Sequence, residues 1–186
     1  FSEASNKRAT FYFMMGDYEN SVEFYGKSVE IKEKLEDNKG LASTLNNIGE
    51  TYFYQENYDQ ALKSFRKSIS YGGNNKDNVF DNERYIGISH YYLGNFDSCH
   101  IYLKRADEYY SMSEVKRMPI LPYLIIAKQK VGDSQASKDL LKEFKRIAEN
   151  NDAEKKDFIL ATWASYEVLS LLGEKKEAKT FLENAY

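Results

Sequence analysis

The side chains with the greatest chemical potential in this sequence are His90, His100 and Cys99. A histidine acts as a metal ligand or base only with partners at fixed spacing, and the sequence has neither an HExxH motif nor a paired Cys/His cluster. A nucleophilic cysteine needs exposure and an activating base. No Ser-His-Asp set, carboxylate pair or nucleotide-binding glycine loop stands out. We therefore expect no enzyme activity, no cofactor and no metal, with His90 and Cys99 acting as packing residues.

Composition and charge indicate a folded, helical protein. Hydrophobic residues make up 42% and charged residues 30%, and only two prolines and ten glycines occur. This balance favours helix over sheet. The net charge is −3 with both signs interspersed, and the pI is about 5.6. Because nucleic-acid binding usually requires a basic patch, we expect no nucleic-acid partner for this segment.

Membrane insertion and secretion find no support in the sequence. The longest apolar stretch, Ile120 to Ala127, is interrupted by Pro122 and is far shorter than the ~20 residues that cross a bilayer. No signal-peptide pattern is present, and the lone Cys99 favours a reducing compartment. We expect a cytoplasmic location. Because the chain begins with Phe1 rather than methionine, we also expect it to be a fragment of a longer protein.

A repeat of nearly constant length runs along the chain. Its anchor residues are 40, 38, 38 and 41 positions apart, at Gly16, Glu56, Gly94, Gly132 and Gly173. Five residues after each anchor stands a small residue: Ser21, Ala61, Cys99, Ser137 and Ala178. Nine residues after each anchor stands a large apolar residue: Tyr25, Phe65, Leu103, Leu141 and Leu182. A small side chain lets two antiparallel helices approach closely, and the large one fills the groove beside it. The pattern predicts five stacked helical hairpins.

Two segments, LNNIGETYFYQENYDQALKSFRKSI (45–69) and MMGDYENSVEFYGKSV (14–29), resemble tetratricopeptide repeats. The family's Leu-Gly…Tyr…Ala…Phe…Ala spacing is carried by Ile48, Gly49, Tyr52, Ala61, Phe65 and Ser68. Leu45 replaces the usual tryptophan, the trailing proline is missing, and the period exceeds the common ~34 residues. The longer period resembles the subclass found in kinesin light chain and in bacterial regulators and sensor kinases. The resemblance implies an all-α, right-handed superhelical solenoid whose first (A) helices line a concave, ligand-binding groove.

The repeat predicts where each A helix and each second (B) helix lies. The expected A helices span 2–15, 38–55, 78–93, 119–131 and 153–172. The expected B helices span 18–36, 58–71, 96–111, 134–149 and 175–185. Since no linker is long enough to divide the chain, we expect a single domain over 1–186. Its repeats are expected at 2–37, 38–76, 77–114, 115–150 and 151–186, with irregular packing in the last two, which lose the aromatic slot.

The implied groove is lined by A-helix residues that the core does not use. These are Asn6, Thr10, Phe13, Asn46, Asn47, Glu50, Phe53, Tyr54, Arg84, Ile88 and Tyr91. Asn47 falls at the family's conspicuous asparagine position, where the side-chain amide typically bonds the backbone of an extended ligand. The alternative is that Asn46 and Asn47 only bond neighbouring helices. Asn6 and Thr10 replace the lysine and asparagine of the family's carboxylate clamp, which disfavours an acidic C-terminal tail as ligand.

These observations lead to one expected function and one alternative. We expect a module that binds a protein or peptide, serving as the sensory or docking segment of a larger bacterial signalling or regulatory protein. The alternative is a structural scaffold or self-assembly module. It would form a homo-oligomer through the C-terminal end, because the expected last helix, 175–185, has no polar capping helix after it.

Overall fold

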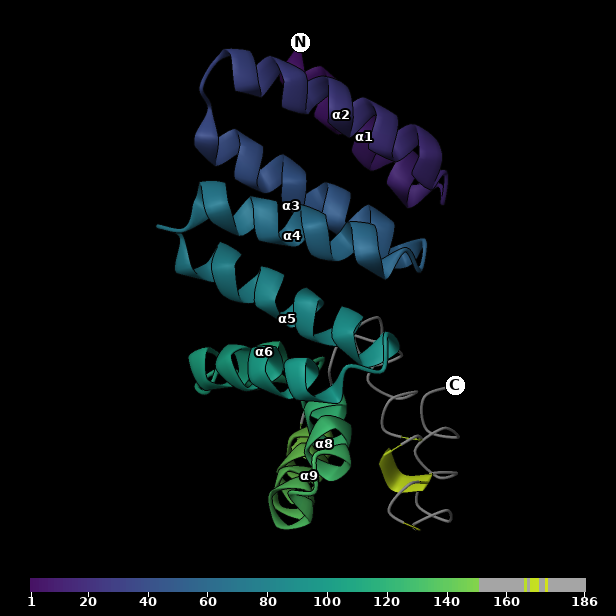
Figure 1. Ribbon diagram of the computed structural model, residues 1–186, viewed down its shortest axis with the longest axis vertical. Coiled ribbons are helices and arrows are strands. Elements are labelled where there is room, and N and C mark those ends of the chain that lie inside the picture. Colours follow the sequence, from purple (N-terminus) through teal and green to yellow (C-terminus); the bar gives the residue numbers. More distant parts are fainter. Residues whose placement is uncertain (151–165, 167, 171–172, 174–186) are drawn as a thin grey trace. The chain divides into compact units, whose positions relative to one another are not determined.

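The computed structural model describes residues 1–150, 166, 168–170 and 173 of the chain (Figure 1). The described part is helical and contains no strand, which confirms the predicted all-α class. The chain divides into two compact units, Phe1–Leu93 and Gly94–Tyr186. The helices are α1 (Ser2–Met14), α2 (Tyr18–Lys34), α3 (Asn38–Tyr54), α4 (Tyr58–Gly72), α5 (Lys76–Tyr92), α6 (Phe96–Tyr109), α7 (Glu114–Arg117), α8 (Leu121–Lys130) and α9 (Ser134–Asn150). Within these ranges, no helix has the length and apolar character that crossing a bilayer requires.

The ends of the predicted helices lie within two residues of the observed ones in the described part of the chain, and one observed helix was not predicted. Helix α5 begins at Lys76 rather than at 78, because the side chain of Asn75 caps it by accepting a hydrogen bond from the backbone N–H of Asn78 (3.2 Å). The short helix α7, between α6 and α8, was not predicted by the repeat pattern. The predicted helices 153–172 and 175–185 lie almost wholly outside the described residues.

The repeat anchors lie in the turns that follow the A helices. All five have left-handed backbone φ angles, of 76° at Gly16, 60° at Glu56, 74° at Gly94, 89° at Gly132 and 82° at Gly173. Glycine adopts this conformation without the steric penalty that other residues incur, so Glu56 is the exception in the series. At three anchors the next residue caps the following helix through its side chain: Asp17 accepts from the N–H of Asn20 (3.2 Å), Asn57 from that of Gln60 and Asp133 from that of Ala136.

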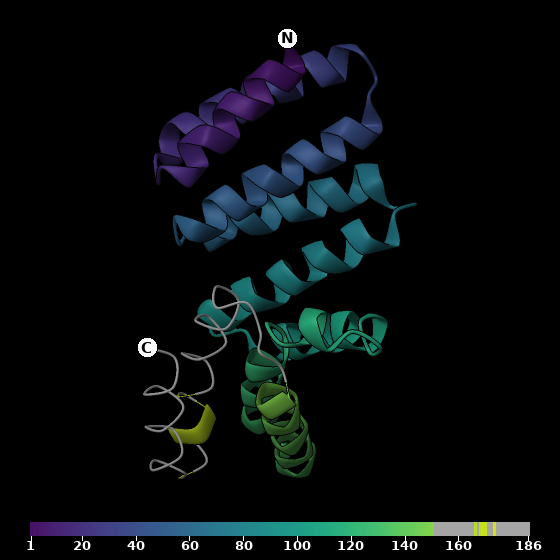
Figure 2. The same ribbon diagram turned by 180° about the vertical axis from the view of Figure 1, so that it is seen from behind.

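Helices α1 to α5 form the first unit, in which each helix packs against the next along the chain. The A helices α1, α3 and α5 run in the same direction, so their C-terminal ends lie on one edge of this unit (Figures 1 and 2). We call it the turn edge. The small residues Ser21 and Ala61 have no exposed surface. A Cβ atom on Gly49 would lie 2.5 Å from the ring of Phe65. The small slots therefore allow close helix packing, as the sequence predicts.

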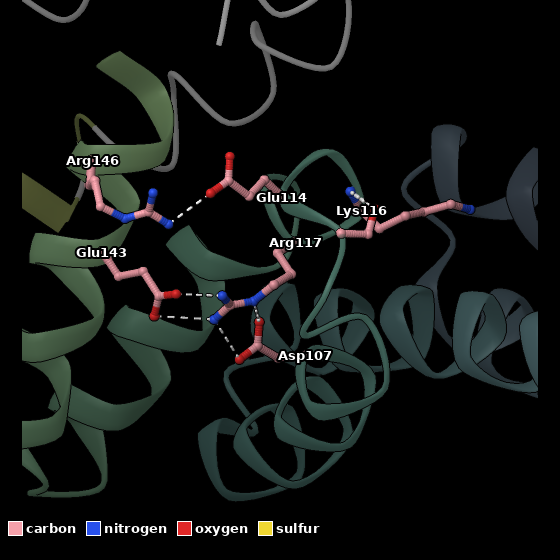
Figure 3. Close-up of polar contacts among 7 residues, drawn as sticks. Asp107, Glu114, Lys116, Arg117, Glu143 and Arg146 are labelled. Atoms are coloured by element: carbon pink, nitrogen blue, oxygen red, sulfur yellow. Dashed lines mark hydrogen bonds and ion pairs between the residues drawn. The ribbon is translucent and has the colours of Figure 1, made fainter. Parts of the chain in front are cut away.

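Helices α6 to α9 belong to the second unit, where an arginine joins three of them. Arg117 of α7 donates from Nε to Asp107 Oδ1 of α6 (2.6 Å) and from Nη1 to Glu143 Oε1 of α9 (2.5 Å) (Figure 3). The hydrogen bond from Arg117 holds the pKa of the Glu143 carboxyl below its usual value, although burial opposes this. A second pair, Arg146 with Glu114 (2.8 Å), lies beside it on the surface.

Candidate functional site

The residues predicted to line the groove all lie in the first unit. They occupy α1 (Asn6, Thr10, Phe13), α3 (Asn46, Asn47, Glu50, Phe53, Tyr54) and α5 (Arg84, Ile88, Tyr91). Because the three helices lie along one another, these residues fall on neighbouring A helices (Figures 1 and 2). Their contacts separate them into a polar group and an aromatic group.

A chain of hydroxyl groups links α1 to α2 in the polar group. Thr10 Oγ1 donates to the backbone oxygen of Asn6 (3.0 Å) and lies 2.9 Å from the hydroxyl of Tyr25. Since Thr10 has only one hydroxyl hydrogen, Tyr25 is the donor between the two. Burial raises the pKa of Tyr25. The side chain of Asn47 opposes this rise by hydrogen bonding to the Tyr25 hydroxyl. Asn47 therefore has a hydrogen-bond partner, Tyr25, on α2.

The side chain of Asn6 bonds a neighbouring A helix. Its Nδ2 donates to Thr44 Oγ1 of α3 (3.4 Å), and Thr44 in turn accepts from the buried Lys32 (2.6 Å). Asn6 therefore has a hydrogen-bond partner on a neighbouring A helix. Asn46 instead bonds within its own helix, donating from Nδ2 to Glu50 Oε1 (2.6 Å).

Glu50 is one of the two charged residues in the predicted set, and its side chain is half-buried. Burial raises the pKa of its carboxyl, and this effect exceeds the opposing influences of the Asn46 amide and the Arg84 charge, while Asp81 adds to the rise. Burial therefore disfavours the ionised form of this carboxyl. The guanidinium of Arg84 lies over the ring of Tyr85, 4.1 Å from the centroid, which orients it across the same surface.

Aromatic rings connect the three A helices near the turn edge. Phe13 of α1 contacts Tyr54 of α3, with ring centroids 5.4 Å apart. Phe53 of α3 contacts Tyr85 and Tyr92 of α5, at 5.3 and 6.2 Å. These edge-to-face contacts join the repeats into one continuous row, which we call the aromatic row. Tyr54 keeps 41% of its surface exposed, so the row is accessible from outside.

Two members of the predicted set occupy the C-terminal half of α5. Ile88 is only 4% exposed, because the whole run Ile86–His90 is buried, and its side chain is not available to a ligand in this structure. Ile88 is therefore not part of a ligand-facing surface. Tyr91 is half-buried and contacts the ring of Tyr92 at 5.2 Å.

The sequence placed Tyr92 among the exposed aromatic residues of the groove, but it missed Tyr85, Met14 and the polar role of the Tyr25 hydroxyl. Tyr25 fills a core slot that holds phenylalanine or leucine in the next three repeats, and its extra hydroxyl was a sign that a polar partner lay nearby. Met14 stands two residues before its anchor, as Tyr54 and Tyr92 do, so the repeat itself could have identified it. Nothing in the repeat singles out Tyr85.

The candidate catalytic residues of the sequence lie in packed surroundings. His90 is 8% exposed, and burial, with the nearby charge of Arg66, lowers its pKa. Cys99 has no exposed surface, and burial raises the pKa of its thiol to about 12, so it is protonated at neutral pH. Within the described ranges, no group of three or more His, Cys, Asp or Glu residues could hold a metal ion.

Comparison with known proteins agrees with this architecture. The family model of the tetratricopeptide repeat matches residues 1–71. The structure is similar to that of a Podosopora anserina putative kinesin light chain with nearly identical TPR-like repeats (TM-score 0.72, 14% identity, 98% of this chain and 92% of that chain). It is also similar to the apo form of RapI (TM-score 0.83, 16% identity, 99% of this chain and 66% of that chain).

A further similar structure is YrrB, described as a TPR protein with an unusual peptide-binding site (TM-score 0.59, 18% identity, 97% of this chain and 82% of that chain). At these identities the likeness to solved structures concerns the fold. Helical repeats of this kind stack into extended surfaces that serve protein interaction. Residues 1–71 therefore match the tetratricopeptide repeat, and the described residues have a TPR-like helical fold.

Proposed function

We propose that the first unit binds a peptide or a segment of a partner protein across its A helices. The proposed surface, which we call the A-helix surface, consists of Thr10, Asn46, Asn47, Glu50, Phe53, Tyr54, Arg84 and Tyr91. The observation that carries the proposal is the accessible aromatic row, in which Tyr54 keeps 41% of its surface exposed, on the same helix as the Glu50 carboxylate that accepts from Asn46 (2.6 Å). Burial raises the pKa of that carboxyl. Such a carboxylate costs folding stability, and costs of this kind concentrate at functional positions.

A ligand that donates a hydrogen bond to the Glu50 carboxylate would offset the cost of burying its charge. A backbone N–H, an amide or a cationic side chain of the partner would donate to the carboxylate, and Arg84 would donate to a carbonyl or carboxylate of the ligand in return. The aromatic residues Phe53, Tyr54 and Tyr91 would provide the apolar anchors on which binding energy concentrates. This combination suits a peptide rather than a small cofactor.

The wider role is inferred from similar proteins. The likeness to YrrB supports peptide recognition, and the likeness to kinesin light chain repeats and RapI supports a docking or regulatory role. We propose that the chain is the cytoplasmic sensory or docking segment of a larger bacterial regulatory protein. The domains encoded beside it in the intact gene test this part directly, since a run of repeats alone would argue for a scaffold.

Selection from a random peptide library displayed on phage tests the binding proposal. We expect peptides enriched on the wild-type chain to bind Glu50→Gln and Asn47→Ala about tenfold or more weakly, because each change removes a partner of the ligand. Glu30→Gln, which changes an exposed carboxylate on α2, is the matched control and should bind as wild type does. Equal binding to all three variants, or no enriched peptide, would overturn the proposal.

A further inference from the structure

Three exposed apolar side chains occupy the same position in the first three repeats. Met14, Tyr54 and Tyr92 each stand two residues before an anchor, at the end of α1, α3 and α5. They are 79%, 41% and 46% exposed. The three helices end on the turn edge (Figures 1 and 2), so these three residues recur along it at equivalent positions of the repeat. We call these three residues the edge strip.

The edge strip rests on ordered rings. Tyr54 contacts Phe13, while Tyr92 stacks on Tyr58 with centroids 4.9 Å apart and planes 7° apart. Such contacts hold the exposed tyrosines in place before any partner arrives, which lowers the entropy cost of binding. Single exposed apolar residues are ordinary, but three in register along one edge make a strip. Methionine and tyrosine are the residue types that recur at adaptable protein-binding surfaces.

The charge around the edge strip has one sign. The stretches 9–26, 40–62 and 85–93, which contain the strip and its turns, include six Asp and Glu residues and no Lys or Arg. Of these, Glu19, Glu23, Glu56 and Asp59 are exposed, and Glu23 is already paired with Lys27 (2.5 Å). Glu19 and Asp59 lie in the first turns of α2 and α4, where an acidic residue also favours the helix dipole.

Glu56 has no such structural reason. It occupies the left-handed anchor position with φ 60°, where the equivalent Gly16 meets no steric penalty. Glu36, in the turn between α2 and α3, has the same left-handed backbone (φ 53°), so this conformation is not particular to the turn edge. The position of Glu56 two residues after Tyr54 adds negative charge directly next to the apolar strip.

We propose that the edge strip docks a basic amphipathic helix of a partner protein, with apolar side chains on Met14, Tyr54 and Tyr92 and lysines or arginines against Glu19, Glu56 and Asp59. Helix-in-groove recognition of this kind combines a row of apolar anchors with a charged rim. The inference goes beyond the proposed function, because the edge strip shares only Tyr54 with the A-helix surface and takes a partner of its own chemistry. The acidic rim argues against an acidic partner, because like charges would face one another across the interface.

Two synthetic probes test this inference by isothermal titration calorimetry. One is an amphipathic helical peptide of leucine and lysine, and the other is its twin with glutamate in place of lysine. We expect the lysine peptide to bind and the glutamate twin not to bind. The triple variant Glu19→Gln/Glu56→Gln/Asp59→Asn should weaken the lysine peptide about tenfold, with a smaller salt dependence. The double variant Met14→Ser/Tyr92→Ser should weaken it similarly by removing the anchors.

The matched control is Glu30→Gln/Glu33→Gln/Glu36→Gln, which removes the same charge from three exposed carboxylates away from the turn edge. An equal loss of affinity in this control would mean unspecific charge attraction and would overturn the inference. Self-association that the Met14→Ser/Tyr92→Ser variant abolishes would also overturn it, because the occupant would then be a second copy. Circular dichroism of each variant verifies that the helices are intact.

The Glu50→Gln variant separates this inference from the proposed function. We expect it to keep its affinity for the lysine peptide, since Glu50 lies outside the edge strip. If Glu50→Gln weakens binding of the library peptides while the edge variants leave the affinity for the lysine peptide unchanged, the inference about the edge strip is wrong. The proposed A-helix surface then stands. If the edge variants weaken the lysine peptide while Glu50→Gln leaves binding of every library peptide unchanged, the proposed A-helix surface is wrong. The inference about the edge strip then stands.

Discussion

Arg117 and Asp107 form a two-point hydrogen-bonded pair in the second unit, with Nε to Oδ1 at 2.6 Å and Nη2 to Oδ2 at 3.1 Å (Figure 3). The side chains are 10% and 14% exposed, so the pair is largely removed from water. It joins α6 to α7, the short helix that stands outside the repeat pattern. Paired guanidinium and carboxylate groups of this geometry fix the direction of the chain between two helices.

Arg117→Ala should strongly destabilise the second unit. The change leaves Asp107 as a buried charge without its partner, which costs about 3–5 kcal/mol. Arg146→Ala is the control, because the Arg146–Glu114 pair is 54% and 40% exposed and such surface pairs contribute less than about 1 kcal/mol. Urea denaturation followed by circular dichroism measures both. Similar losses in the two variants would show that burial of Arg117 contributes little.

Glu50→Gln should stabilise the first unit at neutral pH. The folded-state pKa of Glu50 is raised, so the folded state binds a proton more tightly than the unfolded chain, whose glutamates titrate near about 4.3. The ionised carboxylate therefore opposes folding at neutral pH. This cost disappears as the pH falls through the folded pKa towards the unfolded value. Thermal melts from pH 7 to pH 4 should show wild type gaining stability relative to Glu50→Gln; a constant difference between them would contradict the raised pKa.

Glu56→Gly should raise stability by about 0.5–1 kcal/mol. A non-glycine residue at a left-handed φ costs about 1–2 kcal/mol, and the greater freedom of glycine in the unfolded chain cancels part of the gain. Glu56→Gln keeps the strain and removes the charge, so it should melt as wild type does. Thermal denaturation of the three proteins tests this, and an equal gain in both variants would point to charge repulsion instead.

Gly49→Ala should cost about 1–3 kcal/mol, because the new Cβ would lie 2.5 Å from the Phe65 ring at the crossing of α3 and α4. Replacing Phe65 with leucine in the same chain should recover part of that loss by freeing space at this contact. The free energies of unfolding of the two single variants and the double variant form a cycle that measures the coupling. Simple additivity of the two losses would show that the ring does not oppose the methyl group.

Much of the first unit could be predicted from local sequence features. The anchors Gly16 and Glu56, the small slots Ser21 and Ala61 and most helix ends follow from turn residues and from the helical repeat. These signals act over a few residues and recur in each repeat, so agreement between repeats strengthens each of them. The groove residues were placed on the correct helices for the same reason.

Only the tertiary structure decided what those residues contact. Ile88 is buried, Asn6 bonds Thr44 on the next A helix, and burial raises the pKa of Glu50. Arg117 finds its carboxylates 10 and 26 positions away in the chain, at a helix that the repeat does not contain. Burial, hydrogen-bond partners and pKa shifts depend on contacts between residues far apart in sequence, whereas a repeat pattern records only the spacing within each hairpin.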